Sequence, residues 1–324
     1  MKLRIGIGRY DRTQALIDGR VGVAGYEAEF ESPPFEELFA TAFDTDRYDV
    51  AELSFSNFLY LSATGCCRFL GLPVFPSRMF RHSAVFVRTD RGIRAPRDLI
   101  GRTVGVREYS MTAAIVARGI LEDEYGVRAA DIDWRCGPAD ASDAKPAIRV
   151  FPRDVRMSMI DDGQNLSDML AAGELDAMVA YKPPKAFLAG VPHVARLFPD
   201  PVRVEQDYYA RTGIFPIMHL VGIRRELADD VALCGALCNA FQRAKSEAIE
   251  SIGAYQALEV SLPWAPADLH AVKGLMGEDY WPYGVRANTP AIEAACRYSH
   301  AQGLAHRRMA VDELFAAGSL GWAP

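Results

Sequence analysis

The chain has 324 residues, of which half are hydrophobic and 24% are charged, as in an ordinary globular protein that is large enough for two domains. Lys and Arg number 36 against 42 Asp and Glu, and the net charge of −6 gives no basic surface to a nucleic acid. No apolar run is long enough to span a bilayer. We therefore expect neither a nucleic-acid nor a membrane partner.

The N-terminus passes directly into an apolar strand and lacks the apolar segment and small-residue cleavage site of a secretory signal. If Met1 is the native start, we expect a cytoplasmic protein. The cysteines form no C-x-x-C pair, and no His follows them at the spacing of a zinc site, so reduced thiols are expected. They are Cys66, Cys67, Cys136, Cys234, Cys238 and Cys296.

Apolar and β-branched runs predict strands, and amphipathic runs between them predict helices. The strands are expected at Leu3–Ile7, Val21–Phe30, Tyr48–Leu53, Phe69–Phe75, Phe80–Thr89, Thr103–Val106, Ile132–Cys136, Leu175–Ala180, Val194–Phe198 and Thr212–Arg224. The helices between them are expected at Asp11–Asp18, Phe35–Phe43, Phe58–Thr64, Ala113–Leu121 and Leu166–Ala172. The last hundred residues predict helices only, at Asp229–Ile252, Tyr255–Val260, Pro266–Met276, Pro290–Gln302 and Asp312–Ala317.

Two of these helices begin just after a strand, behind short polar segments that could cap them. The first N–H groups of a helix lack partners within the helix, so such a start attracts an anion. A capped helix without a ligand is the commoner case, and that alternative stays open. The residues expected at the two anion-binding starts are Ser54, Ser56, Asn57, Ser110, Met111 and Thr112.

Two long predicted strands, Phe80–Thr89 and Thr212–Arg224, bracket the middle of the chain. This is the pattern of a chain that leaves one lobe through one strand and returns through another. We expect a discontinuous first lobe of residues 1–84 and 222–324, a second lobe of residues 85–221, and a ligand cleft between them.

Several segments, taken together, resemble segments of a known fold and of a known family. The segments DLIGRTVGV, YDVAELSFSNF and GELDAMVAY resemble the type II periplasmic-binding-protein fold. More narrowly, FRHSAVFVR, GVREYSMTAA, ILEDEYGV, RTGIFPIMHLVGIRRE and GEDYWPYGV resemble the 4,5-dihydroxyphthalate decarboxylase family. The resemblance implies an α/β, two-lobe binding-protein-like fold with a helical C-terminal region, and a cytosolic enzyme built on it.

The resemblance also implies a reaction. It removes one carboxylate of 4,5-dihydroxyphthalate and leaves protocatechuate and carbon dioxide, with the aromatic ring as electron sink and without a redox cofactor. Such a reaction needs an anion clamp, a base for the phenol and an acid for the ring carbon. The implied partner is a small aromatic dicarboxylate.

Arginines and histidines near the two bracketing strands are the first candidates for this site. Arg81 and Arg211 stand at strand edges, where a guanidinium could bind a carboxylate through two hydrogen bonds, although a surface ion pair is as common. His82 and His219 are candidates for proton transfer, because imidazole titrates near neutral pH. We favour function for His82, which lies beside Arg81, and a hydrogen-bonded core role for His219.

Three further polar residues could serve the phenolic end of the substrate: Glu108, Asp279 as a third catalytic candidate, and Tyr283. Glu108 could instead only favour its helix dipole, and Asp279 could only cap a turn. His82, Glu108, His219 and Asp279 contain metal-binding groups, but no H-x-x-x-H or similar local spacing supports a metal site. We expect no metal and no cofactor.

Two other functions remain open from the sequence. A solute-binding protein would capture a small aromatic or other carboxylate without catalysis, and it would share the fold and the anion clamp. A related lyase or synthase acting on another small acid is the third possibility. The long helical C-terminal third offers surface for a homo-oligomer.

Overall fold

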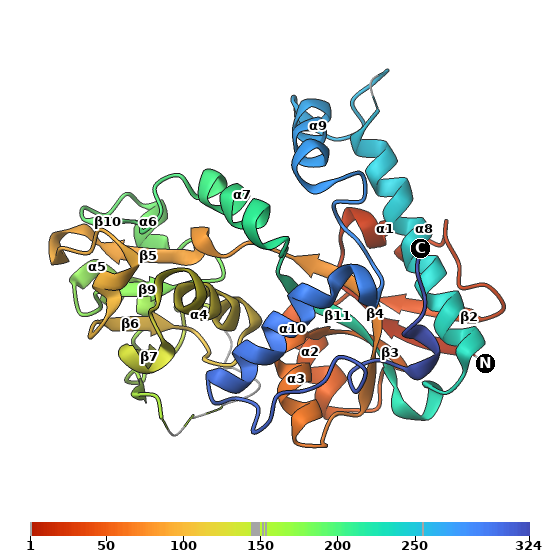
Figure 1. The fold of residues 1–324 in the computed structure, drawn as a ribbon, viewed down its shortest axis with the longest axis horizontal. Coiled ribbons are helices and arrows are strands. Elements are labelled where there is room, and N and C mark those ends of the chain that lie inside the picture. Colours follow the sequence, from red (N-terminus) through yellow and green to blue (C-terminus); the bar gives the residue numbers. More distant parts are fainter. Residues whose placement is uncertain (1, 144–149, 151, 153, 255) are drawn as a thin grey trace.

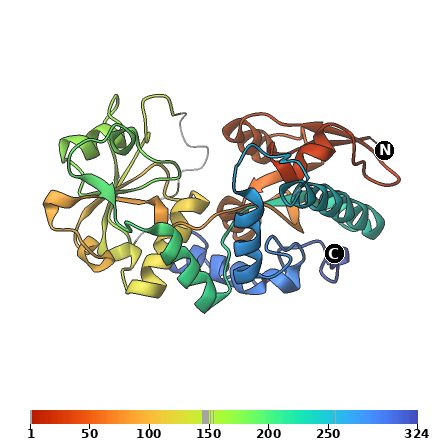
Figure 2. The ribbon, with the colours of Figure 1, turned by 90° about the horizontal axis from the view of Figure 1, so that it is seen from above.

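The computed structural model describes residues 2–143, 150, 152, 154–254 and 256–324 of the chain. Two β-sheets organise it, each covered by helices, and Figure 2 shows them as two bodies side by side. The first sheet has five strands in the order β2-β1-β3-β11-β4, and the second has six in the order β10-β5-β9-β6-β7-β8. The fold is therefore α/β with two sheets, as predicted (Figure 1).

The first body combines the N-terminal and C-terminal parts of the chain (Figure 1). Its strands are β1 (Lys2–Gly6), β2 (Glu27–Glu31), β3 (Val50–Ser54), β4 (Phe69–Arg78) and β11 (Ile217–Arg224). Its helices are α1 (Asp11–Ile17), α2 (Phe35–Asp44), α3 (Phe55–Ala63), α8 (Val231–Ile252), α9 (Ala265–Met276) and α10 (Val285–Ala301). β1 pairs in parallel with β2 and β3, whereas β11 runs antiparallel to β3 and β4.

The second body comes from the middle of the chain, and β6 is paired in parallel with both β7 and β9. Its strands are β5 (Val85–Arg88), β6 (Thr103–Val106), β7 (Asp133–Cys136), β8 (Met157–Met159), β9 (Ala177–Val179) and β10 (Val194–Arg196). Its helices are α4 (Thr112–Tyr125), α5 (Leu166–Ala172), α6 (Lys185–Leu188) and α7 (Pro201–Thr212).

The chain crosses between the bodies after β4 and again before β11. The strand predicted at Phe80–Thr89 is wrong in its first half, because residues 82–84 form a 3-10 turn and β5 begins at Val85. The backbone N–H of Ser83 in that turn donates to Glu205 of α7 at 3.1 Å. All of β11 pairs within the first sheet, so residues 217–221, which the sequence analysis assigned to the second lobe, lie in the first sheet.

Some helix boundaries also differ from the prediction. Residues 256–260 and 312–317 form no α-helix, and Tyr255 lies outside the described residues. Phe315 instead forms a β-bridge with Gly71 of β4, so pairing with the sheet replaces the expected helix. α3 begins at Phe55, directly after β3, and α10 begins at Val285, with Pro290 inside its N-terminal part.

The end of α10 joins the two bodies by packing on α4 (Figure 1). Gly119 of α4 leaves room for the ring of Tyr298, which would lie 2.5 Å from a Cβ at this position. Arg118 is buried beside it, and its Nε donates to Oε1 of Gln302 at 2.7 Å. These contacts fix α4, and therefore its N-terminus, against the first body.

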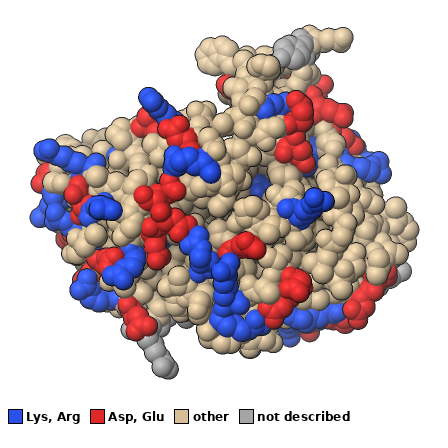
Figure 3. Space-filling view, viewed as in Figure 1, with Lys and Arg blue, Asp and Glu red and all other residues tan. Residues whose placement is uncertain are grey.

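The surface agrees with the charge balance of the sequence. On the face shown in Figure 3, acidic and basic side chains are interspersed and form no field of one sign. Among the described residues, no helix is both long and apolar enough to cross a membrane. All six cysteines are free, and five of them are buried.

Candidate active site

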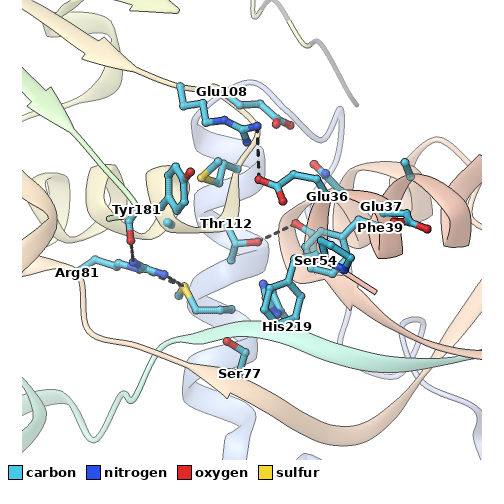
Figure 4. A pocket seen from close by; sticks show the side chains of 18 of the residues that line it. Glu36, Glu37, Phe39, Ser54, Ser77, Arg81, Glu108, Thr112, Tyr181 and His219 are labelled. Carbon is cyan, nitrogen blue, oxygen red and sulfur yellow. Dashed lines mark hydrogen bonds and ion pairs between the residues drawn. The ribbon is translucent and has the colours of Figure 1, made fainter. Parts of the chain in front are cut away.

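A cavity of about 730 Å³ lies between the two bodies. It opens where β3, β6 and β9 end, in keeping with the rule that α/β proteins bind ligands at the carboxyl ends of their strands. Figure 4 shows side chains from both bodies pointing into it. The lining residues are Pro34, Phe35, Glu36, Glu37, Phe39, Ala40, Asp44, Ser54, Asn57, Ser77, Arg81, Arg107, Glu108, Met111, Thr112, Ala113, Tyr181, Met218 and His219.

His219 belongs to a hydrogen-bonded group that sequence reasoning missed. Its Nδ1 lies 2.6 Å from Oε1 of Glu52, whose side chain is fully buried on the neighbouring strand β3. Glu52 also accepts from the hydroxyl of Tyr10 at 2.7 Å and from the backbone N–H of Gly8 at 2.7 Å. Burial, and then the nearby carboxylate, raises the pKa of Tyr10, which therefore stays a neutral donor. The contact at Nδ1 leaves Nε2 of His219 for a molecule in the cavity.

An irregularity in β4 and β11 brings two neighbouring residues to the same cavity. Successive side chains of a regular strand point to opposite faces, yet Met218 and His219 both line the cavity. The pairing of β11 with β4 shifts register on both sides of His219, and Pro73 and Pro76, which have no N–H to donate, lie in β4 there. Such bulges commonly redirect side chains at functional sites.

Aromatic side chains form one wall of the cavity. Phe35 and Phe39 of α2 lie with their ring centroids 5.4 and 4.9 Å from that of His219. On the other body, the ring of Tyr181 lies 5.7 Å from the guanidinium of Arg107. A planar aromatic ring that lies between Phe35 and Phe39 on one side and Tyr181 on the other would gain dispersion and stacking contacts.

Arg81 is a buried cation whose partners are weak. Its Nε and Nη2 lie 3.2 and 3.0 Å from the sulfur of Met218, and its Nη1 lies 3.4 Å from the carbonyl oxygen of Tyr181. Among the described residues, no carboxylate lies within ion-pairing distance of Arg81. Burial lowers its pKa to about 10, against the opposing charge of Glu205, so the group remains charged at neutral pH. A buried guanidinium that has no ion pair among the described residues is suited to bind a carboxylate.

Arg107 is the second arginine of the cavity, and its charge is already balanced. Its Nε lies 3.5 Å from Oδ2 of Asp143, and its Nη2 lies 3.7 Å from Oε1 of Glu36 on the other body. The neighbouring Glu108 accepts from the hydroxyl of Ser110 at 2.6 Å. Burial raises the pKa of Glu108 against this hydrogen bond and the charge of Arg107.

The two predicted helix starts meet in a cluster of hydroxyl groups. The hydroxyl of Thr112 at the start of α4 lies 3.1 Å from that of Ser54 and accepts from the backbone N–H of Ser56 at 3.1 Å. The hydroxyl of Ser56 donates to the carbonyl of Ser110. Ser54 and Thr112 line the cavity and Met111 and Asn57 lie beside them, whereas Ser56 and Ser110 stand behind. The buried Oδ1 of Asn57 has no partner within the described part of the chain.

His82, the favoured catalytic histidine of the sequence analysis, does not line the cavity. It is 1% exposed and packs between Phe198 and Tyr208, with ring centroids 5.5 and 5.2 Å away. Neither ring nitrogen has a hydrogen-bond partner among the described residues. Burial, and then the charge of Arg211, lowers the pKa of His82 to about 4. Its packing, in a 3-10 turn between two aromatic rings, is that of a neutral core residue.

Three other candidates also lie outside the cavity. Asp279 accepts from Lys245 of α8 at 3.0 Å, and the Lys245 ammonium lies 4.6 Å from the ring centroid of the buried Tyr283. Arg211 lies in the last turn of α7 and not at the edge of a strand, and it forms an ion pair with Glu124. Each of these side chains is directed by a partner on a neighbouring helix that local sequence patterns do not show.

The two bodies, with a cavity at their facing strand ends, define a binding-protein-like α/β protein. The periplasmic aliphatic sulphonate binding protein SsuA from Escherichia coli is similar, with 13% identity, a TM-score of 0.55 and coverage of 97% of this chain and 91% of that one. A mutant of the desulfurization enzyme DSZB in complex with biphenyl-2-sulfinic acid has 17% identity, a TM-score of 0.54 and coverage of 97% and 96%. These likenesses confirm the predicted fold.

Sequence relatives are more specific. The chain is 40% identical to the 4,5-dihydroxyphthalate decarboxylase of Comamonas testosteroni over 322 residues, which cover 99% of this chain and 98% of that one. It is 38% identical to the enzyme of the same name from Pseudomonas putida over 210 residues, which cover 64% and 81%. No family model matches the chain. The chain belongs to the 4,5-dihydroxyphthalate decarboxylase family.

Proposed function

We propose that the protein is a carboxy-lyase that converts 4,5-dihydroxyphthalate to protocatechuate and carbon dioxide without oxidation. The names of its relatives support this substrate. The observation that carries the proposal is a histidine held by a buried carboxylate, His219 on Glu52, in the same cavity as the buried cation Arg81, which has no ion pair within the described part of the chain. A protein that only captured its ligand would need the cation but not the histidine–carboxylate pair.

The reaction requires one proton at a ring carbon. As the hydroxyl para to the departing carboxylate releases electron density into the ring, the carbon that bears that carboxylate accepts a proton from Nε2 of His219. The bond from this carbon to the carboxylate then breaks, and its electron pair restores the aromatic ring. Carbon dioxide leaves, so the reaction consumes one proton overall.

The other groups of the cavity have separate roles in this proposal. Glu52 orients the ring of His219, because its buried carboxylate lies 2.6 Å from Nδ1 and leaves Nε2 for the substrate. The aromatic wall of Phe35 and Phe39 holds the ring of the substrate. Acidic side chains, including Glu108, line the cavity and can accept hydrogen bonds from the two phenolic hydroxyls.

Turnover is the direct test. Purified protein is incubated with 4,5-dihydroxyphthalate, with and without a chelator, and chromatography follows the loss of substrate and the appearance of protocatechuate. We expect stoichiometric conversion that the chelator does not change, in line with the prediction that no metal or cofactor is needed. Tight binding without conversion would instead support the solute-binding alternative. The cytoplasmic location and the homo-oligomer stay predictions.

A further inference from the structure

The proposed substrate is symmetric, which raises the question of why only one carboxylate is lost. Each of its two carboxylates is para to a hydroxyl, and the carboxylate that protocatechuate keeps is also para to a hydroxyl. The chemistry of the ring would therefore allow a second decarboxylation to catechol. The protein must distinguish the carboxylate that leaves from the one that stays.

The two arginines of the cavity differ in their ion pairs, and this difference can distinguish the two carboxylates of the substrate. Arg107 forms ion pairs with Asp143 and Glu36. Among the described residues, the guanidinium of Arg81 instead bonds to a thioether sulfur and a carbonyl oxygen, and Glu205 acts on it at longer range. A carboxylate therefore binds more strongly at Arg81. A strong cation on the departing carboxylate would slow the reaction, because that group loses its charge as neutral carbon dioxide forms, and the ground state would be stabilised more than the transition state. The retained carboxylate keeps its charge throughout.

We propose that Arg81 binds the carboxylate that is retained, and that this contact makes the enzyme require two adjacent carboxylates and stop after one decarboxylation. The inference rests on the proposed function. The arrangement of β11 supports it: Met218 touches Arg81, and the next residue is His219, with both side chains in the cavity (Figure 4). A carboxylate on Arg81 thus places the neighbouring ring carbon beside the histidine.

The same placement has a consequence for the product. Protocatechuate binds to Arg81 through its single carboxylate, and in the orientation in which the substrate reacts it presents carbon 6, which carries hydrogen and is para to the hydroxyl on carbon 3, to His219. In heavy water His219 delivers a deuteron to carbon 6 while the hydroxyl on carbon 3 supplies electron density. The original proton then returns to His219 and the ring is restored. No bond to carbon breaks except that to hydrogen, so the enzyme exchanges this hydrogen and makes no catechol.

Proton NMR of protocatechuate with the full-length protein in heavy water tests this directly. The expected result is loss of the signal of the hydrogen on carbon 6, with the hydrogens on carbons 2 and 5 retained and no catechol formed. Arg81→Met should lower both this exchange and kcat/KM for 4,5-dihydroxyphthalate by on the order of 100-fold. The matched control is Arg135→Met, which removes a half-buried arginine that pairs with Asp133 outside the cavity. It should leave both rates unchanged.

The outcomes separate the two proposals. Failure of the wild-type protein to convert 4,5-dihydroxyphthalate overturns the proposed function. Conversion combined with catechol formation, with exchange at another carbon, or with no exchange at protocatechuate concentrations that inhibit the reaction, overturns the role of Arg81 alone. An Arg81→Met variant that melts like the wild type and keeps its rates also overturns it. If that variant does not fold, the wild-type exchange pattern still decides, and Arg81→Lys repeats the rate comparison with the charge retained.

Discussion

Two histidines of this chain look alike in the sequence and differ in everything that surrounds them. His219 lies on a strand of the first body, bonded to a buried carboxylate and open to the cavity. His82 lies in a 3-10 turn of the crossing segment, packed between two aromatic rings without a hydrogen bond among the described residues. Being next to an arginine in sequence did not place a histidine at the site. A charged partner and access to the cavity distinguish the functional environment.

The largest effect should come from replacing His219. We expect His219→Gln to lower kcat by about 10³-fold, because the ring carbon loses its proton donor. Binding of phthalate, a diacid without the phenolic hydroxyls, should change little, because Arg81 and the aromatic wall remain. Steady-state kinetics and calorimetric titration with phthalate measure the two effects.

The matched variant is His82→Phe, which keeps an aromatic ring between Phe198 and Tyr208. Its kcat should stay within a few-fold of the wild type, because His82 does not line the cavity. A loss of turnover as large as that of His219→Gln, in a protein that melts at the same temperature as the wild type, would show that His82 takes part in catalysis and would contradict its assignment as a core residue.

His82 should instead affect the pH dependence of the free energy of unfolding. Its pKa is about 4 in the folded chain against an ordinary value of 6.5, so the unfolded chain binds the extra proton more readily between these pH values. The stability is therefore fully present above pH 6.5 and falls as the pH drops towards 4. At pH 4.5 the wild type should lose on the order of 2 to 3 kcal/mol from this residue, and His82→Phe should not. Urea unfolding of both proteins at pH 7 and 4.5 measures the difference, and equal losses would contradict it.

The fold was predictable where apolar periodicity was strong, and not where tertiary contacts decide. The strand over Thr103–Val106 and the helix that follows are confirmed, because a β-branched run and an apolar stripe specify them locally. The segment from Phe80 has the same apolar character, yet its turn is fixed by Glu205, more than a hundred residues away. The helix expected at Asp312–Ala317 is replaced by pairing beside Gly71, which no local pattern shows.

The site was predictable in part for the same reason. Serine and threonine after a strand mark helix starts, and both predicted starts lie at the cavity. Glu52 was missed because it reads as one residue of a buried strand, YDVAEL. A single carboxylate inside an apolar strand that ends at a helix start was nevertheless a usable signal, since a buried charge needs a partner. The composition of their loop predicted Asp279 and Tyr283 as site residues. Lys245 of α8 instead binds Asp279, and its ammonium lies over the ring of Tyr283.

Replacement of Glu52 should have the next largest effect on turnover. Glu52→Gln keeps the size of the side chain and an oxygen for the backbone N–H of Gly8, but replaces the carboxylate that holds Nδ1 of His219 with a neutral amide. We expect kcat to fall about 30-fold, equivalent to about 2 kcal/mol, with KM little changed. Glu52→Asp, which keeps the charge, should recover part of the loss. A fall confined to KM would mean that Glu52 orders the binding site and takes no part in proton transfer.

Within the hydrogen-bonded group of His219, the smallest effect should come from Tyr10, which donates to Glu52 and does not itself line the cavity. Tyr10→Phe removes the 2.7 Å hydrogen bond to Glu52 and a longer contact of 3.4 Å with Nδ1 of His219, and it leaves the Glu52–His219 contact in place. A hydrogen bond to a charged group contributes about 1.5 kcal/mol, so kcat should fall about tenfold. The order of effects, His219 over Glu52 over Tyr10, follows distance from the reacting carbon. If Tyr10→Phe lost more than Glu52→Gln, this order would be wrong, and Glu52 would not be the residue through which Tyr10 acts on His219.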